Sequence, residues 1–403
     1  MRLKPRLQPL LISRYTATSC IGTGLAATRE ALAAGRSGLT PCDFETVALD
    51  TWIGRVPHLE EVVLSPVLAD YDCRNNRLAL LGLLQDGFVD AALDAVARYG
   101  AHRVAVLLGT STSGILETEL AYRARDPHTG ALPAAFHYRG SHNIFSVAEF
   151  VRHVVGANGP AWVTSTACSS SAKVFASAAR LIETGVIDAA VVGGVDSLCL
   201  TTLYGFNSLE LVSKTPCRPY DAARSGISVG EAAAFALLER APASLDADAV
   251  LLTGSGESSD AHHMSSPHPQ GLGARMAMEQ ALAGAGLQAA DIDYINLHGT
   301  ATPSNDAAEG QAVQELFGSA TPASSTKGAT GHTLGAAGGL EAVFCAIALA
   351  DGLMPGSPGT EALDPAIGLA YQVRPRPAPL RHVLSNALGF GGTNCSLVLS
   401  RAG

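Results

Sequence analysis

The chain has 403 residues, of which 47% are hydrophobic and 16% are charged. This composition supplies enough apolar material for a large core and argues against a disordered chain, and the length suggests two or three domains. A net charge of −9 and the absence of a Lys/Arg run argue against a nucleic-acid-binding protein.

The cysteines and the apolar segments indicate a cytoplasmic protein without membrane insertion. The 8 cysteines form no C-x-x-C pair, which argues against a disulfide scaffold or a zinc site. The stretch Met1–Arg6 is basic, but the apolar segment behind it is short, interrupted by proline and without a cleavage site. Apolar runs such as Ala342–Ala350 are shorter than the roughly 20 residues of a spanning helix.

Strand-like and helix-like segments alternate along the chain, which predicts an α/β fold. The expected strands are 103–109, 161–165, 189–194, 233–238, 250–253, 292–297, 382–386 and 395–400, and the expected helices are 169–184, 273–283, 306–317 and 334–350. A polar, proline-containing segment at 241–248 is the expected midpoint. In each half a strand is followed by a helix start, at Cys168 and at Gly331, so we expect a duplicated five-stranded unit with halves 1–245 and 246–403.

Cys168 is the first candidate functional residue. It follows the apolar run 162–165 through a turn of small residues, directly before an expected helix. Unpaired N–H groups and the helix dipole at such a position favour an anion, and both lower a thiol pKa. A small buried cysteine is the more common situation, so this position alone predicts a nucleophile only weakly.

Three further motifs place polar residues at the ends of apolar elements, where sites on α/β sheets usually form. They are His298–Asp306 after a strand, Lys327–His332 at a helix start and Asn386–Asn394 between two strands. Each is weak alone, since a histidine beside glycine is often structural and a glycine-rich loop is often only a turn.

Together and in this order, the motifs resemble those of the β-ketoacyl-[acyl-carrier-protein] synthases, the condensing enzymes of fatty acid and polyketide assembly. The likeness consists of Cys168, then His-Gly-Thr-x-Thr-Pro from His298, Lys-x-x-x-Gly-His from Lys327 and Gly-Phe-Gly-Gly-Thr-Asn from Gly389. It extends over nearly the whole chain, including 35–38 and 217–221. The resemblance implies a thiolase-like five-layer α-β-α-β-α fold built from two duplicated halves.

The resemblance also implies catalytic roles. Cys168 would accept the acyl chain from a carrier-protein thioester, which splits one condensation into two easier steps. The N–H groups of Cys168 and Phe390 would form the oxyanion hole. Neutral His298 and His332 would donate to the enolate left when a malonyl thioester loses CO2, and the position of His332 at a helix start would keep it neutral. No metal and no cofactor would be needed.

Supporting residues follow from the same resemblance. Lys327 and Glu309 would form an ion pair near the histidines, for which a plain structural salt bridge is the alternative. Phe390 would also gate the acyl pocket. The predicted substrate-binding residues are Thr300, Thr302, Thr112, Ser266, Gly391 and Gly392, with Thr112 in the acyl pocket near a dimer interface. For Thr300, Thr302 and Ser266, a loop hydroxyl bonding its own backbone is an equal alternative.

An acidic acyl carrier protein would need a basic patch on this acidic chain. The docking candidates are Arg74, Arg77, Arg123, Arg125 and Lys214, and a merely solvated face is the alternative. Rim charges of this kind mainly set the association rate and its salt sensitivity.

The sequence therefore predicts an acyltransferase: a stand-alone β-ketoacyl synthase that condenses malonyl carrier protein with an acyl chain on Cys168, extending a fatty acid, polyene or polyketide. Gly230-Glu231 is followed by Ala232–Ala234 where the family usually has Gly-Ala-Gly, which favours a dedicated pathway over housekeeping synthesis. The partner would be a second copy or a ketosynthase-like chain-length factor, with this chain as the catalytic half.

Three other classes are less well supported. A papain-like protease has a similar coarse Cys-His-Asn spacing but a different local signature at the cysteine. A non-catalytic chain-length factor would lack the nucleophile that this chain keeps at Cys168. A thiolase would need a second catalytic cysteine near the C-terminus, and Cys395 is expected in a core strand.

Overall fold

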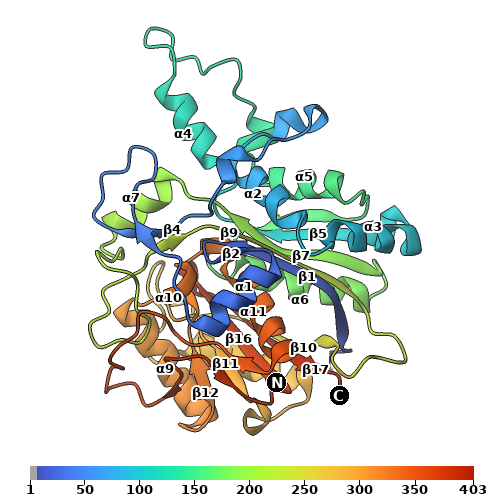
Figure 1. The fold of residues 1–403 in the computed structure, drawn as a ribbon, viewed down its shortest axis with the longest axis vertical. Helices are drawn as coiled ribbons and strands as arrows, with labels where there is room; N and C mark the ends of the chain where they lie inside the picture. The colour runs from blue at the N-terminus through green and yellow to red at the C-terminus, as the bar shows by residue number, and fades with distance from the viewer. Residues whose placement is uncertain (1–6) are drawn as a thin grey trace.

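The computed structural model describes residues 7–403 (Figure 1). The basic stretch Met1–Arg6, considered above as a signal sequence, lies outside the described residues.

A 12-stranded mixed sheet is the framework of the described chain, in the order β14-β12-β11-β16-β17-β10-β1-β9-β7-β5-β6 with β2 beside β1. Its strands are β1 (Leu10–Ser19), β2 (Gly22–Thr23), β5 (Val104–Gly109), β6 (Ala161–Thr164), β7 (Ala189–Asp196), β9 (Ala232–Arg240), β10 (Val250–Ser259), β11 (Tyr294–Asn296), β12 (Pro322–Ser324), β14 (Ala370–Tyr371), β16 (His382–Gly389) and β17 (Thr393–Arg401). Two small sheets pair β3 (Thr40–Pro41) with β4 (Trp52–Gly54) and β8 (Val229–Gly230), and β13 (Leu353–Met354) with β15 (Arg376–Pro377).

The same strand arrangement occurs twice in this sheet. In the first copy β1, β9, β7, β5 and β6 are neighbours, with two antiparallel and then two parallel pairings. In the second copy β10, β17, β16, β11 and β12 repeat that order and those directions. β1 and β10 join the copies through an antiparallel pairing of Leu10 with Leu252. The division of the chain at 245/246 falls in the loop between β9 and β10 and stays a prediction.

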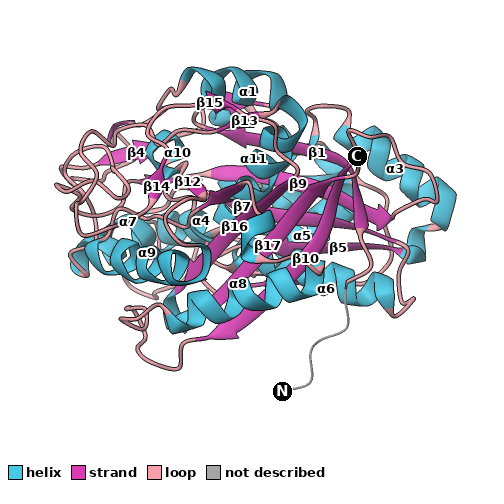
Figure 2. Ribbon diagram, turned by 90° about the horizontal axis from the view of Figure 1, so that it is seen from below, coloured by secondary structure: helices cyan, strands magenta, loops and turns pink. Residues whose placement is uncertain are grey.

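Helices cover both faces of the two half-sheets and fill the space between them (Figures 1 and 2). The helices are α1 (Leu25–Ala34), α2 (Arg74–Leu83), α3 (Phe88–Tyr99), α4 (Ile115–Arg123), α5 (Ser146–Val154), α6 (Ser170–Glu183), α7 (Leu200–Ser208), α8 (Leu272–Ala285), α9 (Pro303–Phe317), α10 (Lys327–Thr330) and α11 (Ala337–Asp351). α6 and α11 pack against each other and against strands of both copies, α2, α3 and α5 cover the first half-sheet from outside, and α8 and α9 cover the second. The five-layer thiolase-like fold is confirmed.

The helix at 334–351 belongs to the central layer. Leu334–Asp351 is long and apolar enough to span a membrane by length and composition alone, but 89% of this window is buried inside the fold. The apolar surface of this segment is therefore used as core.

Element boundaries differ from the sequence expectation where packing overrides pattern. β10 extends to Ser259 although its second half, from Gly254 on, contains glycines and polar residues. It pairs with β17 along its length, and a Cβ at Gly256 would lie 1.9 Å from the Ala277 carbonyl oxygen of α8. The glycines thus allow the helix to lie on the strand.

In the first 100 residues, where no element was expected, the chain forms β1 to β4 and α1 to α3.

Candidate active site

Cys168 lies in a tight turn between β6 and α6. Ala167, directly before it, has a left-handed backbone with φ of 52°. The Ser170 hydroxyl accepts from the Thr166 N–H at 2.9 Å and donates to the Ala167 carbonyl at 2.5 Å. These bonds over-determine a conformation that is otherwise costly for alanine. The turn places Cys168 immediately before the first residues of α6, as predicted.

Cys168, His298 and His332 converge although they are far apart in the sequence. The Sγ atom of Cys168 lies 2.9 Å from Nε2 of His332. The two imidazoles meet edge to face, with centroids 5.3 Å apart and an angle of 84° between planes. One potential ligand atom of each residue lies within 4.8 Å of the others, and all three side chains are buried. A single small reactant can contact all three.

Both imidazoles are neutral at pH 7. Burial lowers the pKa of His298 and of His332 well below the usual 6.5, and the nearby Lys327 ammonium lowers both further. The neutral state was predicted from a helix start, and His332 does lie just before the helical segment that begins at Leu334. The causes that lower the pKa of His332 are nevertheless burial and the Lys327 charge. Neutral rings donate an N–H and remain able to accept a proton.

The resting state of Cys168 differs from the expected thiolate. Burial raises the pKa of its thiol to about 11, although the Lys327 charge and the Phe390 backbone N–H both act to lower it. The prediction of a thiolate stabilised by a helix N-terminus is wrong in this respect, because the thiol is buried. Its proton faces Nε2 of His332, which is close enough to accept it.

The predicted ion pair between Lys327 and Glu309 is wrong. Nζ of Lys327 lies 3.3 Å from Nδ1 of His298 and forms a close salt bridge with Glu341. Lys327 is only 1% exposed, so an ammonium at this position needs a carboxylate partner. Since an ammonium can only donate, its contact with Nδ1 leaves the His298 proton on Nε2.

Glu309 has a different position. Its carboxylate accepts from the backbone N–H groups of His298 and Gly299, both at 2.8 Å, and from the Tyr220 hydroxyl at 2.9 Å. Glu309 therefore holds the backbone of His298 in place, and it does not pair with the Lys327 ammonium.

Glu341 was missed in the sequence. It is the single charged residue within the apolar run Ala337–Leu349 of α11. A lone carboxylate in an apolar core helix requires a buried partner, and this was the available signal.

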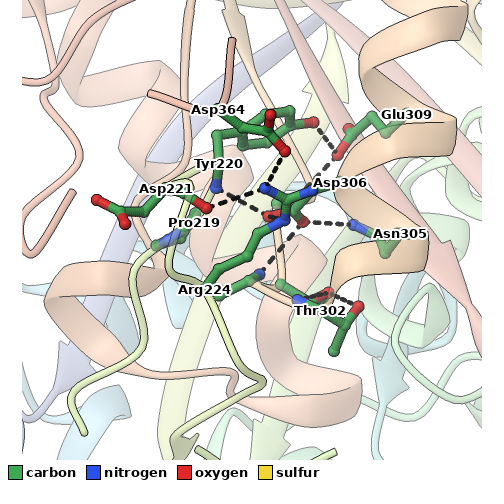
Figure 3. A network of polar contacts seen from close by, with 12 residues as sticks. Pro219, Tyr220, Asp221, Arg224, Thr302, Asn305, Asp306, Glu309 and Asp364 are labelled. Atoms are coloured by element: carbon green, nitrogen blue, oxygen red, sulfur yellow. Dashed lines mark hydrogen bonds and ion pairs between the residues drawn. The ribbon is translucent and has the colours of Figure 1, made fainter. Parts of the chain in front are cut away.

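A polar network supports the loop behind His298 (Figure 3). Asp306 accepts from the backbone N–H groups of Tyr220 at 2.8 Å and Ala301 at 3.2 Å. Arg224 lies 3.6 Å from Asp306 and bonds Asp364 at 2.7 Å. These contacts link the 217–221 motif to the His-Gly-Thr-x-Thr-Pro motif, which explains why the two belong to one site.

A pocket opens above the three converging residues. Its apolar wall includes Phe206, Leu211, Ile227, Leu388 and Phe390. The predicted substrate residues Thr300, Thr302, Ser266 and Gly392 also line it. Phe390 packs against Phe206 with ring centroids 5.8 Å apart, so the predicted gate residue forms part of the apolar wall of the pocket.

Two predicted substrate-binding residues, Thr112 and Gly391, do not line this pocket of the described chain, and their role in substrate binding stays a prediction. The Thr112 hydroxyl and backbone N–H both donate to buried Asp196, at 2.7 and 2.8 Å, and Thr112 is absent from the lining of the pocket above Cys168 within the described chain. A buried carboxylate needs hydrogen-bond donors, and Thr112 supplies two of them to Asp196. The Gly391 N–H donates to the Met264 carbonyl at 2.7 Å, which ties the Phe390 loop to the 260–267 loop.

The predicted carrier-protein docking residues differ in how exposed their side chains are. Arg74 is 7% exposed, and its guanidinium bonds buried Glu231 at 2.6 and 2.8 Å, so its prediction as a docking residue is wrong. Arg77 is paired with Asp72 at 2.6 Å. Arg123, Arg125 and Lys214 are exposed and remain candidates.

Family models match both halves of the chain: the beta-ketoacyl synthase N-terminal domain over 77–244 and the C-terminal domain over 249–361. Two curated relatives are 3-oxoacyl-[acyl-carrier-protein] synthases 2. The one from Rhizobium meliloti (strain 1021) is 37% identical over 314 residues, covering 73% of each chain. The one from Staphylococcus aureus (strain COL) is 34% identical over 262 residues, covering 61% of this chain and 63% of the relative.

Two solved structures are also similar. The ketosynthase ApeO in complex with its chain length factor ApeC, from Xenorhabdus doucetiae, has a TM-score of 0.89 and 38% identity, covering 100% of both chains. The ishigamide ketosynthase/chain length factor has a TM-score of 0.88 and 26% identity, covering 98% of this chain and 100% of that one. With both domains matched and a relative of this identity and coverage, the chain belongs to the β-ketoacyl synthase family.

Proposed function

We propose that this protein is a condensing acyltransferase that joins malonyl-[acyl-carrier protein] to an acyl chain held on Cys168. The observation that supports this best is the convergence of one thiol and two neutral imidazoles in a buried pocket. The reaction needs a nucleophile, an oxyanion site and N–H donors for an enolate, and the residues of the pocket supply each of them.

In the loading step, the Cys168 thiol gives its proton to Nε2 of His332, and the sulfur attacks the thioester carbonyl. The backbone N–H groups of Cys168 and Phe390 stabilise the oxyanion, and the carrier thiolate leaves and takes up the proton. Nδ1 of His332 has no hydrogen-bond partner among the described residues. The ring can therefore carry its proton on either nitrogen, as a change from acceptor to donor requires.

In the condensation step, the malonyl thioester oxygen accepts N–H bonds from His298 and His332. Breaking the bond to the carboxylate releases CO2 and leaves its electron pair as an enolate. The enolate carbon attacks the acyl carbonyl, and the Cys168 thiolate leaves and takes up one proton from solvent. Lys327 keeps the His298 proton on Nε2, facing the oxygen. These steps need neither a metal nor an organic cofactor.

Acylation measured by intact mass tests this proposal. Wild-type protein incubated with acyl carriers of increasing chain length is expected to gain one acyl mass on the Cys168 peptide. Cys168→Ala is expected to gain none, and His298→Ala to load normally but to release no CO2 from malonyl carrier. Acylation of Cys168→Ala, or normal CO2 release by His298→Ala, would contradict the assigned roles.

We also infer that the chain works as a dimer with a second copy or with a chain-length factor, in the cytoplasm. The similarity to ApeO, whose structure contains a chain length factor, supports the heterodimer. Native mass of the purified chain, alone and co-expressed with a chain-length factor, distinguishes the two assemblies.

A further inference from the structure

The helix α7 forms one wall of the pocket and is attached to the fold mainly on one side. Leu200 and Leu203 pack in an apolar cluster, whereas Thr201, Tyr204 and Asn207 are exposed. Phe206, in the last turn, contacts Phe390 beside Cys168. The position of α7 therefore decides where the Phe206 ring lies in the pocket.

The N-terminus of α7 is capped by a residue from another helix. Cys199, at the N-cap, makes no side-chain cap hydrogen bond. Instead, the carboxylate of Glu119, on α4, accepts from the Leu200 N–H at 3.0 Å and from the Thr201 N–H at 2.7 Å, and it also bonds the Thr201 hydroxyl. A carboxylate at this position satisfies unpaired donors and interacts favourably with the helix dipole.

α4 projects from the body of the protein (Figure 1). Its outer residues include exposed Leu120 and Tyr122, and Arg123 follows at its end. Contact with another chain on this helix would reach α7 through Glu119, and α7 in turn contacts Phe390. This gives a continuous physical connection from a surface helix to the acyl pocket.

We propose that Glu119 is a positioning residue that sets the acyl-chain preference of the pocket by fixing α7 and Phe206. The inference rests on the proposed function, because it concerns the chain that Cys168 accepts. Without Glu119 the first turn of α7 loses three hydrogen bonds, two from backbone N–H groups and one from the Thr201 hydroxyl, and Phe206 is free to move away from Phe390. The wall of the pocket formed by Phe206 can then move outward, so that longer acyl chains fit in the pocket.

Acylation rates of Cys168 by holo carrier proteins bearing a short and a long saturated chain provide the test. We expect Glu119→Ala to raise the ratio of long-chain to short-chain rates by about tenfold, the scale on which a pocket distinguishes chain size. Glu119→Gln keeps a carbonyl oxygen for the Thr201 N–H, and it is expected to restore most of the wild-type ratio.

Glu117→Ala is the matched control. Glu117 lies on the same helix and accepts from the Arg74 N–H at 2.8 Å, so it caps α2 instead. α2 contributes no residue to the pocket above Cys168 within the described chain. We expect Glu117→Ala to lower the melting temperature but to leave the rate ratio unchanged.

A double-mutant cycle tests whether Glu119 acts on the pocket through Phe206. Phe206→Ala alone should shift the ratio in the same direction as Glu119→Ala, and the double variant should shift it no further. Full additivity, or an equal loss of rate for both chains in Glu119→Ala, would overturn this inference alone. Absence of acylation in the wild type would overturn the proposed function and this inference with it.

Discussion

Cys168 and His332 form a buried pair in which neither side chain is charged at rest. Burial opposes the charged form of both groups: it raises the pKa of the thiol to about 11 and lowers the pKa of the imidazole. The nucleophile is therefore generated when a substrate is bound, and the resting enzyme protects its thiol from reactions that need a thiolate.

The alkylation of Cys168 should follow this pKa. Below the pKa the thiolate fraction rises tenfold per pH unit, so the iodoacetamide rate at Cys168 should rise about tenfold per unit from pH 7 to 10. Peptide mapping by mass spectrometry after timed quenching separates Cys168 from the other cysteines. A rate that levels off between pH 7 and 8 would show a thiolate already present at rest.

The pairing of Lys327 with Glu341 predicts the free energy of unfolding of two variants. Glu341→Ala leaves a buried ammonium without its carboxylate and should lower the free energy of unfolding by about 3–5 kcal/mol. Lys327→Met/Glu341→Leu removes both charges and should recover most of that loss. Urea denaturation measures both values.

The control for this pairing is Glu309. In double-mutant cycles, Lys327→Ala should couple to Glu341→Ala more strongly than to Glu309→Ala. Stronger coupling of Lys327 to Glu309 than to Glu341 would support the Lys327–Glu309 ion pair that the sequence suggested.

The catalytic residues could be predicted from the sequence because their motifs, taken together and in order, resemble those of a known family, although each motif is weak alone. Their partners could not. Glu341 lies 14 positions from Lys327, and only tertiary packing brings them together. The direction of a side chain is equally absent from a linear pattern, so Arg74 was expected on the surface, whereas its guanidinium is buried against Glu231.

The elements α6 and α11 meet at unusually close range in the central layer. A Cβ on Gly338 would lie 2.7 Å from the Ala172 Cβ and 2.8 Å from the Ala172 backbone nitrogen. Cys168 lies two residues before α6 and His332 lies five residues before α11, so the close approach of the helices helps to bring the nucleophile and the imidazole together. The sequence predicted both helices, but their separation depends on the absence of a side chain at Gly338.

Gly338→Ala should therefore separate the two helices. We expect a loss of about 1–3 kcal/mol in unfolding free energy from overpacking, together with slower acylation of Cys168. Gly284→Ala is the matched control, because Gly284 is also in a helix and a Cβ there would meet nothing closer than 3.7 Å. That variant should be neutral or slightly more stable. Equal effects of the two substitutions would contradict the close contact as the cause.

For the whole molecule, the repeated strand order was predictable in outline because strand and helix patterns recur in both halves. The pairing of β1 with β10 was not, since no residue pattern identifies which edges join. The central helices each contact strands of both half-sheets, so apolar surface of one copy is covered by the other.

Separated halves should accordingly fail to fold. Fragments 1–245 and 246–403, expressed alone, should bind a hydrophobic dye and melt without a cooperative transition, and co-expression should recover soluble complex. The intact chain should unfold in one calorimetric transition. Cooperative melting of either fragment alone would contradict a shared core.

The middle layer also lets the two copies of the repeat differ. A chain with one copy alone would leave its inner helix exposed to water, whereas here each inner helix is covered by the other copy. Because both copies lie in one chain they need not be identical: Cys168 precedes the inner helix of the first, and His298 and His332 belong to the second.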